Sequence, residues 1–524
     1  MCFGLEYISV GYPGNYRFVQ GLISVTSNPI VNVFGDWGSD LTWKYLLRNT
    51  GNGPSAICLS LLLSGYRPYY NGEPHPNPYL MDKLQKLGKS ESIIDQDLAY
   101  LSEGLEGRSS NPVALLFDNL VRPDADLGAE NPSVLEWKHE PEFAINHAVL
   151  GKNKPGGAWQ KMDAGSMQTL SLGNWMELPT LPFRDWSDQK IRKESVAVNN
   201  RATISDVRNY YTEFVKLRQL ESNFHDHHVV TSVQKVFKIN NHIDMESGEV
   251  LPCCVNVKKN HPYHWEVRGY KFTDEGDDGT SQREEFCFTA PHVVIATGTF
   301  DIPNRLNIPG ETLPHVYHSL HELDHNLNGS MIPSNENDPI LVVGAGLSAA
   351  DAILMALKAE RQVIHVFRSG ANDSSLIFKK LPAGMYPEYH KIHSLMKGTI
   401  CNPLYRPYPK HCIEEIKEDM GVLLKKIDSD DITSVDISCV VILIGARPDL
   451  SFLQQDGRNL GIVSRHPIDS KHNPIDIDLF SYQSNQEPGL FALGPLIGDN
   501  FVRFGIAGTL GVTNYLLRKR RKHF

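Results

Sequence analysis

The segment from Pro339 to Arg368 constrains the fold more than any other part of the chain. It opens on the apolar run Ile340–Val343, which is typical of a strand buried on both faces of a parallel sheet. A Gly-Ala-Gly turn follows at 344–346, after which apolar residues recur at helical spacing and a second apolar run occupies 363–367. This order of strand, glycine turn, helix and strand predicts a dinucleotide-binding unit of an α/β fold.

The small residues of this turn have separate physical roles. Gly344 allows the tight turn, Gly346 lets the backbone approach a pyrophosphate, and Ala349 keeps the helix close to the strand. Arg368 directly follows the second strand, where a basic residue accommodates the 2′-phosphate of NADP and an acidic one would favour NAD. We therefore expect the unit to bind NADPH. The alternative is a glycine turn in an ordinary parallel sheet, which GxGxxA alone does not exclude.

A second turn of the same kind lies near the start of the chain. Gly51, Gly53 and Ala56 match its three small positions, and the apolar run at 57–63 predicts a helix that ends before Gly65. Two such turns in one chain predict two nucleotide sites.

The residues before this second turn are unusual. Such a unit ordinarily begins with an apolar strand, but residues 46–50 read LLRNT, with a charge and an amide. Residues 1–48 form an atypical segment with little periodicity. Two interpretations stay open, a variant or mis-assigned N-terminus and a tolerated irregular strand. Glu73 is the candidate for the ribose-binding acid expected about 20 positions on, although Pro68 and Pro74 interrupt the strand around it.

Bulk properties favour small-molecule chemistry. A chain of 524 residues is longer than one hydrophobic core usually organises, so more than one domain is expected. Its 51 Lys+Arg and 61 Asp+Glu give a net negative charge, which disfavours nucleic acid or an anionic membrane as a partner. No apolar run approaches the ~20 residues that span a bilayer, and the eight cysteines form no C-x-x-C pair, which indicates a reducing compartment. The histidines within 225–228 lack metal-ligand spacing, so no metal is expected. The basic tail 518–522 is either a solvated helix end or a nuclear-import patch.

Several strings in the chain resemble the oxidative stress-induced growth inhibitors of animals, which are related to flavin-containing monooxygenases. The resemblance covers about residue 51 to the C-terminus and rests on GNGPSAICLSLLLSGYRPY, DQDLAYLSEGLEGRSSNPVALLFD, VLGKNKPGGAW, VVIATGTFDIPNRLNIPG, PILVVGAGLSAADA, LPAGMYPEYHKIH and LGPLIGDNFVRF. It implies an NADPH-dependent monooxygenase that uses FAD and O₂ on an unidentified substrate, with a role in growth, differentiation, cell death or cytokinesis. It also suggests a cytoplasmic location, with the midbody as a further one and the nucleus another if the basic tail acts in import.

The same resemblance assigns the remaining site residues. FAD is expected at Gly51, Gly53 and Ala56, beside Gly157 and Trp159 of the GG-x-W segment. Asp499, in the closing Gly-Asp element, is the candidate for a contact with the flavin ribityl chain and ring edge, and Asn500 or backbone groups are the alternative. No catalytic side chain is assigned, because the cofactor carries the chemistry. A regulatory protein that keeps the fold with little or no turnover remains the alternative.

The resemblance also orders the domains. Apolar strands at 293–296 and 440–444 resemble those that link the two dinucleotide-binding lobes of such flavoproteins. We expect an α/β fold with two Rossmann-like domains of the FAD/NAD(P)-binding superfamily. The expected FAD domain is discontinuous, with an NADPH domain inserted into it. The predicted bounds are 49–325 and 440–524 for the FAD domain and 326–439 for the NADPH domain.

Overall fold

The computed structural model describes residues 47–88, 90–162, 167–190, 201–237, 241–243, 250–252, 263–272, 282–328 and 338–521. The chain divides after Trp43, and residues 44–524 form one unit. The predicted atypical segment 1–48 lies outside the described residues except for its last two positions.

Two five-stranded sheets, in which all neighbouring strands are parallel, form the framework of the described chain. The first has the order β24-β13-β1-β4-β7 and the second β15-β22-β16-β17-β18. Strands of the first are β1 (Leu47–Thr50), β4 (His147–Leu150), β7 (Phe224–His225), β13 (His292–Ile295) and β24 (Leu490–Ala492). Strands of the second are β15 (Val316–Tyr317), β16 (Ile340–Val343), β17 (Val363–Phe367), β18 (Tyr405–Pro409) and β22 (Cys439–Ile442). We call each sheet with its helices a lobe.

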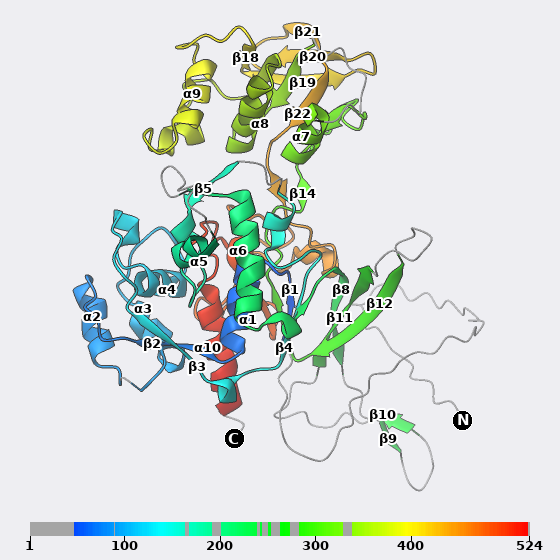
Figure 1. Ribbon diagram of the computed structural model, residues 1–524. Coiled ribbons are helices and arrows are strands. Elements are labelled where there is room, and N and C mark those ends of the chain that lie inside the picture. The colour runs from blue at the N-terminus through cyan, green and yellow to red at the C-terminus, as the bar shows by residue number, and fades with distance from the viewer. Residues whose placement is uncertain are drawn as a thin grey trace. The chain divides into compact units, whose positions relative to one another are not determined.

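Helices pack around each sheet, as the two groups of ribbons in Figure 1 show. In the first lobe α1 packs against α6 and α10, and in the second α8 packs against α7 and α9. The helices are α1 (Pro54–Leu63), α2 (Pro78–Gln85), α3 (Leu98–Ser102), α4 (Pro112–Val121), α5 (Phe183–Lys190), α6 (Ile204–Leu217), α7 (Leu320–Asn328), α8 (Leu347–Lys358), α9 (Pro387–Met396) and α10 (Gly508–Arg521). The predicted helices at 57–63 and after Gly346 are confirmed.

Antiparallel strands form smaller sheets beside these frameworks. The larger two are β8 (His228–Phe237), β11 (Tyr263–Phe272) and β12 (Arg283–Ala290), and β19 (His411–Ile416), β20 (Gly421–Lys426) and β21 (Ile432–Asp436). The pairs are β2 (Tyr66–Tyr70) with β3 (Leu135–His139), β5 (Gln168–Leu172) with β6 (Arg201–Thr203), β9 (Asn241–Ile243) with β10 (Val250–Pro252), and β14 (Ile302–Pro303) with β23 (Ala446–Arg447).

The strand before the first glycine turn forms despite its polar sequence. β1 lies at the centre of the first sheet, where Arg48 pairs with Val293 of β13 and with Ala148 of β4. Backbone hydrogen bonds do not depend on side-chain polarity, so a strand whose backbone groups pair with a neighbouring strand on each side can form with this composition. The polar residues 47–50 thus form a strand of the first sheet, and the two interpretations of the segment before it stay predictions.

Sheet membership differs from the predicted edges of the domains. β15 and β22 pair within the second sheet, although residues 316–317 and 440–442 were expected in the FAD domain. The antiparallel pair β14 and β23 lies where the chain passes between the sheets. The two-domain division itself remains a prediction, with the second lobe extended at both ends.

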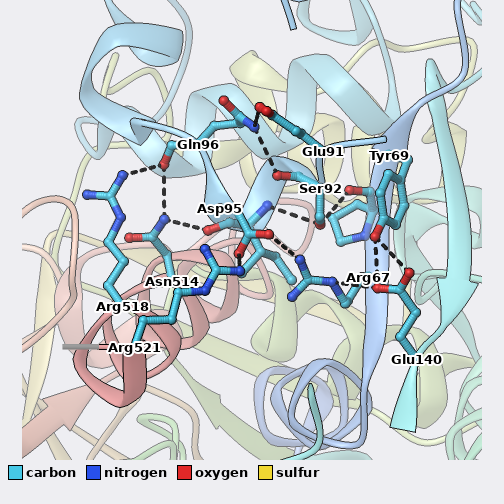
Figure 2. A network of polar contacts seen from close by, with 12 residues as sticks. Arg67, Tyr69, Glu91, Ser92, Asp95, Gln96, Glu140, Asn514, Arg518 and Arg521 are labelled. Atoms are coloured by element: carbon cyan, nitrogen blue, oxygen red, sulfur yellow. Dashed lines mark hydrogen bonds and ion pairs between the residues drawn. The ribbon is translucent and has the colours of Figure 1, made fainter. Parts of the chain in front are cut away.

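An insertion of about 80 residues separates α1 from β4, and it anchors the C-terminal helix (Figure 2). Arg67 of β2 is buried and forms ion pairs with Asp95 and Glu140. Asp95 also pairs with Arg521 of α10 at 2.9 Å, and Arg518 donates to a backbone carbonyl of the insertion at 2.9 Å. These contacts occupy basic residues that the sequence suggested were either solvated or an import signal.

Arg201 connects the lobes at the start of β6. Its side chain is only 4% exposed, pairs with Glu388 of α9 at 2.7 Å, and donates from Nε to the Thr169 carbonyl oxygen at 2.6 Å. The Tyr386 hydroxyl donates to the Leu170 carbonyl oxygen at 2.5 Å. The segment before α9 is therefore held against the antiparallel pair β5 and β6 by polar contacts that are buried or half-buried.

We expect Arg201→Ala to lower the free energy of unfolding by about 1–3 kcal/mol, because the ion pair with the half-buried Glu388 and the hydrogen bond to the carbonyl oxygen of buried Thr169 are lost. Chemical denaturation followed by circular dichroism would measure the change. Arg184→Ala is the matched control, since its side chain is 88% exposed, and its effect should stay within about 0.5 kcal/mol. Equal effects of the two substitutions would contradict the role given to Arg201.

Candidate functional site

The glycine turn of the second lobe lies between β16 and α8. Gly344 has φ +128°, and a Cβ placed on it would lie 2.3 Å from the carbonyl oxygen of Leu443. Gly346 is the N-cap of α8, and a Cβ placed there would meet nothing within 4 Å. Ala349 is fully buried, with its methyl group directed at the Gly344 position. Gly344 thus permits the turn itself, whereas Gly346 leaves its approach open.

His365 stabilises this turn from below, a role that sequence analysis missed. It is buried on β17, with Nε2 2.6 Å from the Gly344 carbonyl oxygen and Nδ1 2.7 Å from the Tyr405 hydroxyl. Burial lowers its pKa to about 4, so the ring is neutral near pH 7. A neutral ring that donates from Nε2 and accepts at Nδ1 satisfies both contacts. The sequence did contain a signal for this role, namely a histidine inside an otherwise apolar strand.

Arg368 follows β17 directly and has an exposed side chain. The end of the strand beside β16 is the predicted place for a residue that reads the ribose substituent. The structure therefore brings Arg368 to the same sheet edge as Gly344 and Gly346.

The first-lobe turn repeats this construction. Gly51 has φ +111°, and a Cβ on it would lie 2.4 Å from the Ala296 carbonyl oxygen after β13. Its N–H donates to the Leu150 carbonyl oxygen of β4 at 2.8 Å. Gly53 is the N-cap of α1, and Ala56 is fully buried in that helix. The turn is thus held between the strands on both sides of β1.

The GG-x-W segment meets this turn, although about 100 residues separate them. The Gly156 N–H donates to the Asn52 carbonyl oxygen at 2.8 Å. Gly157 has φ +62°, and a Cβ on it would lie 2.8 Å from Cα of Gly53. Trp159 is half-buried against the core of the first lobe. The structure therefore brings these predicted residues together.

Asp499 lies in a closing element that returns to the start of α1. A Cβ on Gly494, five residues earlier, would lie 2.9 Å from Ser55 Oγ. The Asp499 carboxylate is buried, and its Oδ1 accepts from Ser109 Oγ at 2.8 Å and Asn111 Nδ2 at 2.9 Å. Burial raises its pKa to about 6. Its Oδ2 is buried without a partner among the described residues, which leaves one oxygen for a ligand.

The ribose-binding acid is not where the sequence suggested. Glu73 follows β2, which forms a two-stranded sheet with β3 and does not belong to the first sheet. The strand beside β1 is β4, and the residue that follows it is Gly151. The candidate Glu73 is therefore wrong, because the insertion displaces β2 from the position that a second strand ordinarily takes.

Other classes of site find no support in the described part of the chain. It contains no cluster of His, Cys, Asp or Glu suited to a metal ion. None of its helices combines the length and apolarity that crossing a membrane requires. Its cysteines are all free, and burial raises the pKa of Cys58 to about 12 and that of Cys439 to about 11.

Comparisons with known proteins place the chain in a family. A family described as pyridine nucleotide-disulphide oxidoreductase matches residues 278–473. Oxidative stress-induced growth inhibitor 2 of Homo sapiens is 45% identical over 483 residues, covering 90% of this chain and 93% of the human protein. The chain belongs to the oxidative stress-induced growth inhibitor family. A homolog from Caenorhabditis elegans is 29% identical over 486 residues, covering 89% of this chain and 92% of that protein.

Solved structures agree on the fold. Bacillithiol disulfide reductase from Bacillus cereus matches with a TM-score of 0.53 at 16% identity, covering 91% of this chain and 99% of that one. L-lysine 6-monooxygenase from Pseudomonas syringae matches with a TM-score of 0.51 at 12% identity, covering 90% and 99%. Family membership thus confirms the resemblance in the sequence, and the predicted FAD/NAD(P)-binding, Rossmann-type flavoprotein fold is confirmed.

The two glycines of the second-lobe turn predict separable effects. Gly344→Ala places a methyl group against a backbone carbonyl at positive φ and should cost about 1–3 kcal/mol of stability. Gly346→Ala should leave stability within about 1 kcal/mol and weaken nucleotide binding instead, because its methyl would occupy the open approach. Thermal unfolding and NADPH titration measure the two effects. Equal losses of stability would contradict this division of roles.

Proposed function

We propose that the protein is an NADPH-dependent flavoprotein oxidoreductase of the monooxygenase type. The observation that carries the proposal is the meeting of Gly157 with Gly53 in the first lobe, near a closing element that contains the half-satisfied Asp499. The open turn at Gly346 supplies a second nucleotide site. Two such sites in one unit suit a reaction that passes a hydride between two cofactors.

The residues present fit both cofactors. Gly53 and Gly157 let the GG-x-W backbone pack closely against the start of α1, where backbone N–H groups would hold a pyrophosphate, and the free Oδ2 of Asp499 can accept from a ribityl hydroxyl. Gly51 and Ala56 keep the turn tight, and Trp159 bounds this side of the site. Bound flavin would supply the redox chemistry, since it can be reduced by NADPH and reoxidised by O₂. The chain would orient the cofactor and exclude water, and no side chain is assigned as catalytic.

The second lobe is proposed to hold NADPH. Gly344, Gly346 and Ala349 would place the pyrophosphate at the N-terminus of α8, where backbone N–H groups point outward. Arg368 would pair with the 2′-phosphate from its exposed position. His365 would keep the turn in shape without touching the nucleotide.

A disulfide reductase is the related alternative, since the matched family and the Bacillus protein carry such names. That reaction needs two cysteines close together beside the flavin. Among the described residues Cys58 is buried behind the first turn with a raised pKa, and its Sγ contacts Thr509 rather than another thiol. This arrangement favours the oxygenase type. The substrate is proposed to be a small molecule.

Growth regulation is proposed from the names of the relatives. A regulatory chain without turnover would keep the same fold, and it is the second candidate because β1 is polar. The proposed location is cytoplasmic.

We expect purified protein to be yellow, with a flavin absorbance that NADPH bleaches and air restores. The physical reason is reduction of the bound flavin and its reoxidation by O₂. An absorbance spectrum before and after anaerobic addition of NADPH measures it. Colourless protein that binds no added FAD and consumes no NADPH would support the regulatory candidate instead.

Arg368→Ala should weaken the binding of NADPH by about 10- to 100-fold, because one charge-assisted contact to phosphate is lost. NADH lacks that phosphate, so its affinity should hardly change. Titration of the variant and of wild type with both nucleotides measures the ratio. Arg406→Ala, on neighbouring β18, is the control. Equal weakening of NADPH and NADH by the Arg368 variant would remove the basis for preferring NADPH.

A further inference from the structure

The first lobe lacks a carboxylate on the strand that normally supplies one. In dinucleotide-binding units an acidic residue that follows the strand beside the glycine turn hydrogen-bonds the adenosine ribose. Here that position is Gly151. A Cβ placed on Gly151 would lie 2.0 Å from Nδ2 of Asn52, so the Asn52 side chain fills the space that a longer residue would need. The ribose therefore cannot obtain its acceptor from β4.

The next strand of the sheet ends in an aspartate at the same level. Leu150 pairs with His225 in the register of β4 and β7, which places Asp226 beside Gly151. The Gly151 N–H donates to the His225 carbonyl oxygen at 3.1 Å, and the Gly151 carbonyl oxygen accepts from the His228 N–H at 2.9 Å. These two bonds clamp Asp226 against the carboxyl edge of the sheet.

The Asp226 carboxylate is directed toward the glycine turn and is only partly satisfied. The Asn52 side chain, which lies within the turn, is close enough to lower the pKa of Asp226 by hydrogen bonding, and its Nδ2 also donates to the Asn153 carbonyl oxygen. Oδ1 of Asp226 is buried and has no partner among the residues that the structure describes. Burial raises the pKa of Asp226, while His227, Lys154 and the Asn52 hydrogen bond act against that rise. A buried carboxylate oxygen without a donor is costly, so an incoming hydroxyl would be stabilised there.

We propose that Asp226 receives the adenosine ribose hydroxyls of FAD in the first lobe and takes the place of the acid missing from β4. The inference rests on the proposed function, since it deepens the FAD site. A carboxylate accepts from ribose hydroxyls and repels a 2′-phosphate. The first lobe therefore selects nucleotides with an unmodified adenosine ribose, whereas the second lobe, with Arg368, selects phosphorylated ones.

The test compares ligands that contain the ribose with one that does not. Asp226→Ala and the nearly isosteric Asp226→Asn should weaken the binding of FAD by about 10- to 100-fold, because hydrogen bonds to a charged acceptor are lost. FMN, which lacks the adenosine, should bind as it does to wild type. Flavin fluorescence measures both dissociation constants. Glu221→Ala, which removes an exposed carboxylate from the segment before β7, is the control and should leave FAD binding unchanged.

Competition experiments test whether the first lobe prefers an unmodified ribose to a 2′-phosphorylated one, apart from its overall affinity for nucleotides. ADP should displace FAD from the wild-type protein better than 2′,5′-ADP, and both Asp226 variants should lose this preference. Unchanged FAD affinity in these variants, equal weakening of FMN, or stronger competition by 2′,5′-ADP would each overturn the inference. Failure of the wild-type chain to bind FAD would instead end the proposed function, and ADP binding to the Asp226 variants would still decide the role of this residue.

Discussion

Close approach of backbone to backbone at the carboxyl edge of each sheet is the constraint on which both sites depend. Gly51 lies against the carbonyl that follows β13, and Gly344 lies against the carbonyl of Leu443 after β22. A single methyl group would not fit at either point. The same close packing aims the N-termini of α1 and α8 at the space above the sheets, where anions are stabilised by unsatisfied N–H groups. Binding capacity thus follows from the absence of side chains as much as from their presence.

Much of this arrangement could be predicted because it is local. The unit built on Gly344, Gly346 and Arg368 follows from residues adjacent in sequence, and the structure reproduces its strands and helix within one residue of expectation. The meeting of Gly157 with Gly53 was available only through family resemblance, since nothing in the spacing of two distant glycine turns says that they touch.

Other features escaped prediction because they depend on which strands become neighbours. Glu73 was chosen by counting along the chain, but an insertion takes β2 out of the first sheet and puts β4 beside β1. The membership of β15 and β22 in the second sheet was not indicated by the sequence, because apolar runs such as β22 fit either sheet equally well. His365 was overlooked since its partners, Gly344 and Tyr405, come together only in the folded sheet. Side-chain polarity alone carries no information about such pairings.

The contacts of α8 extend beyond its N-terminus. The Tyr389 hydroxyl donates to Asp351 of α8 at 2.8 Å, and the adjacent Glu388 pairs with Arg201 of the other lobe. Burial raises the pKa of Asp351 to about 6. Two side chains, those of Tyr389 and Glu388, therefore lie between the helix proposed to hold the NADPH phosphates and Arg201 of β6. This short path links the orientation of the second lobe to the helix that would hold its nucleotide.

The interrupted course of the first sheet has a consequence for biosynthesis. Its outer strand β24, the closing element with Asp499 and the helix α10 all follow the second lobe in the chain. During translation the second lobe can complete its sheet before β24, the last strand of the first sheet, has been synthesised. Domains that are continuous in sequence generally fold as they emerge from the ribosome. The flavin site, in contrast, cannot be assembled until after its neighbour, and for that interval the unfinished edge of the first sheet needs protection from other chains.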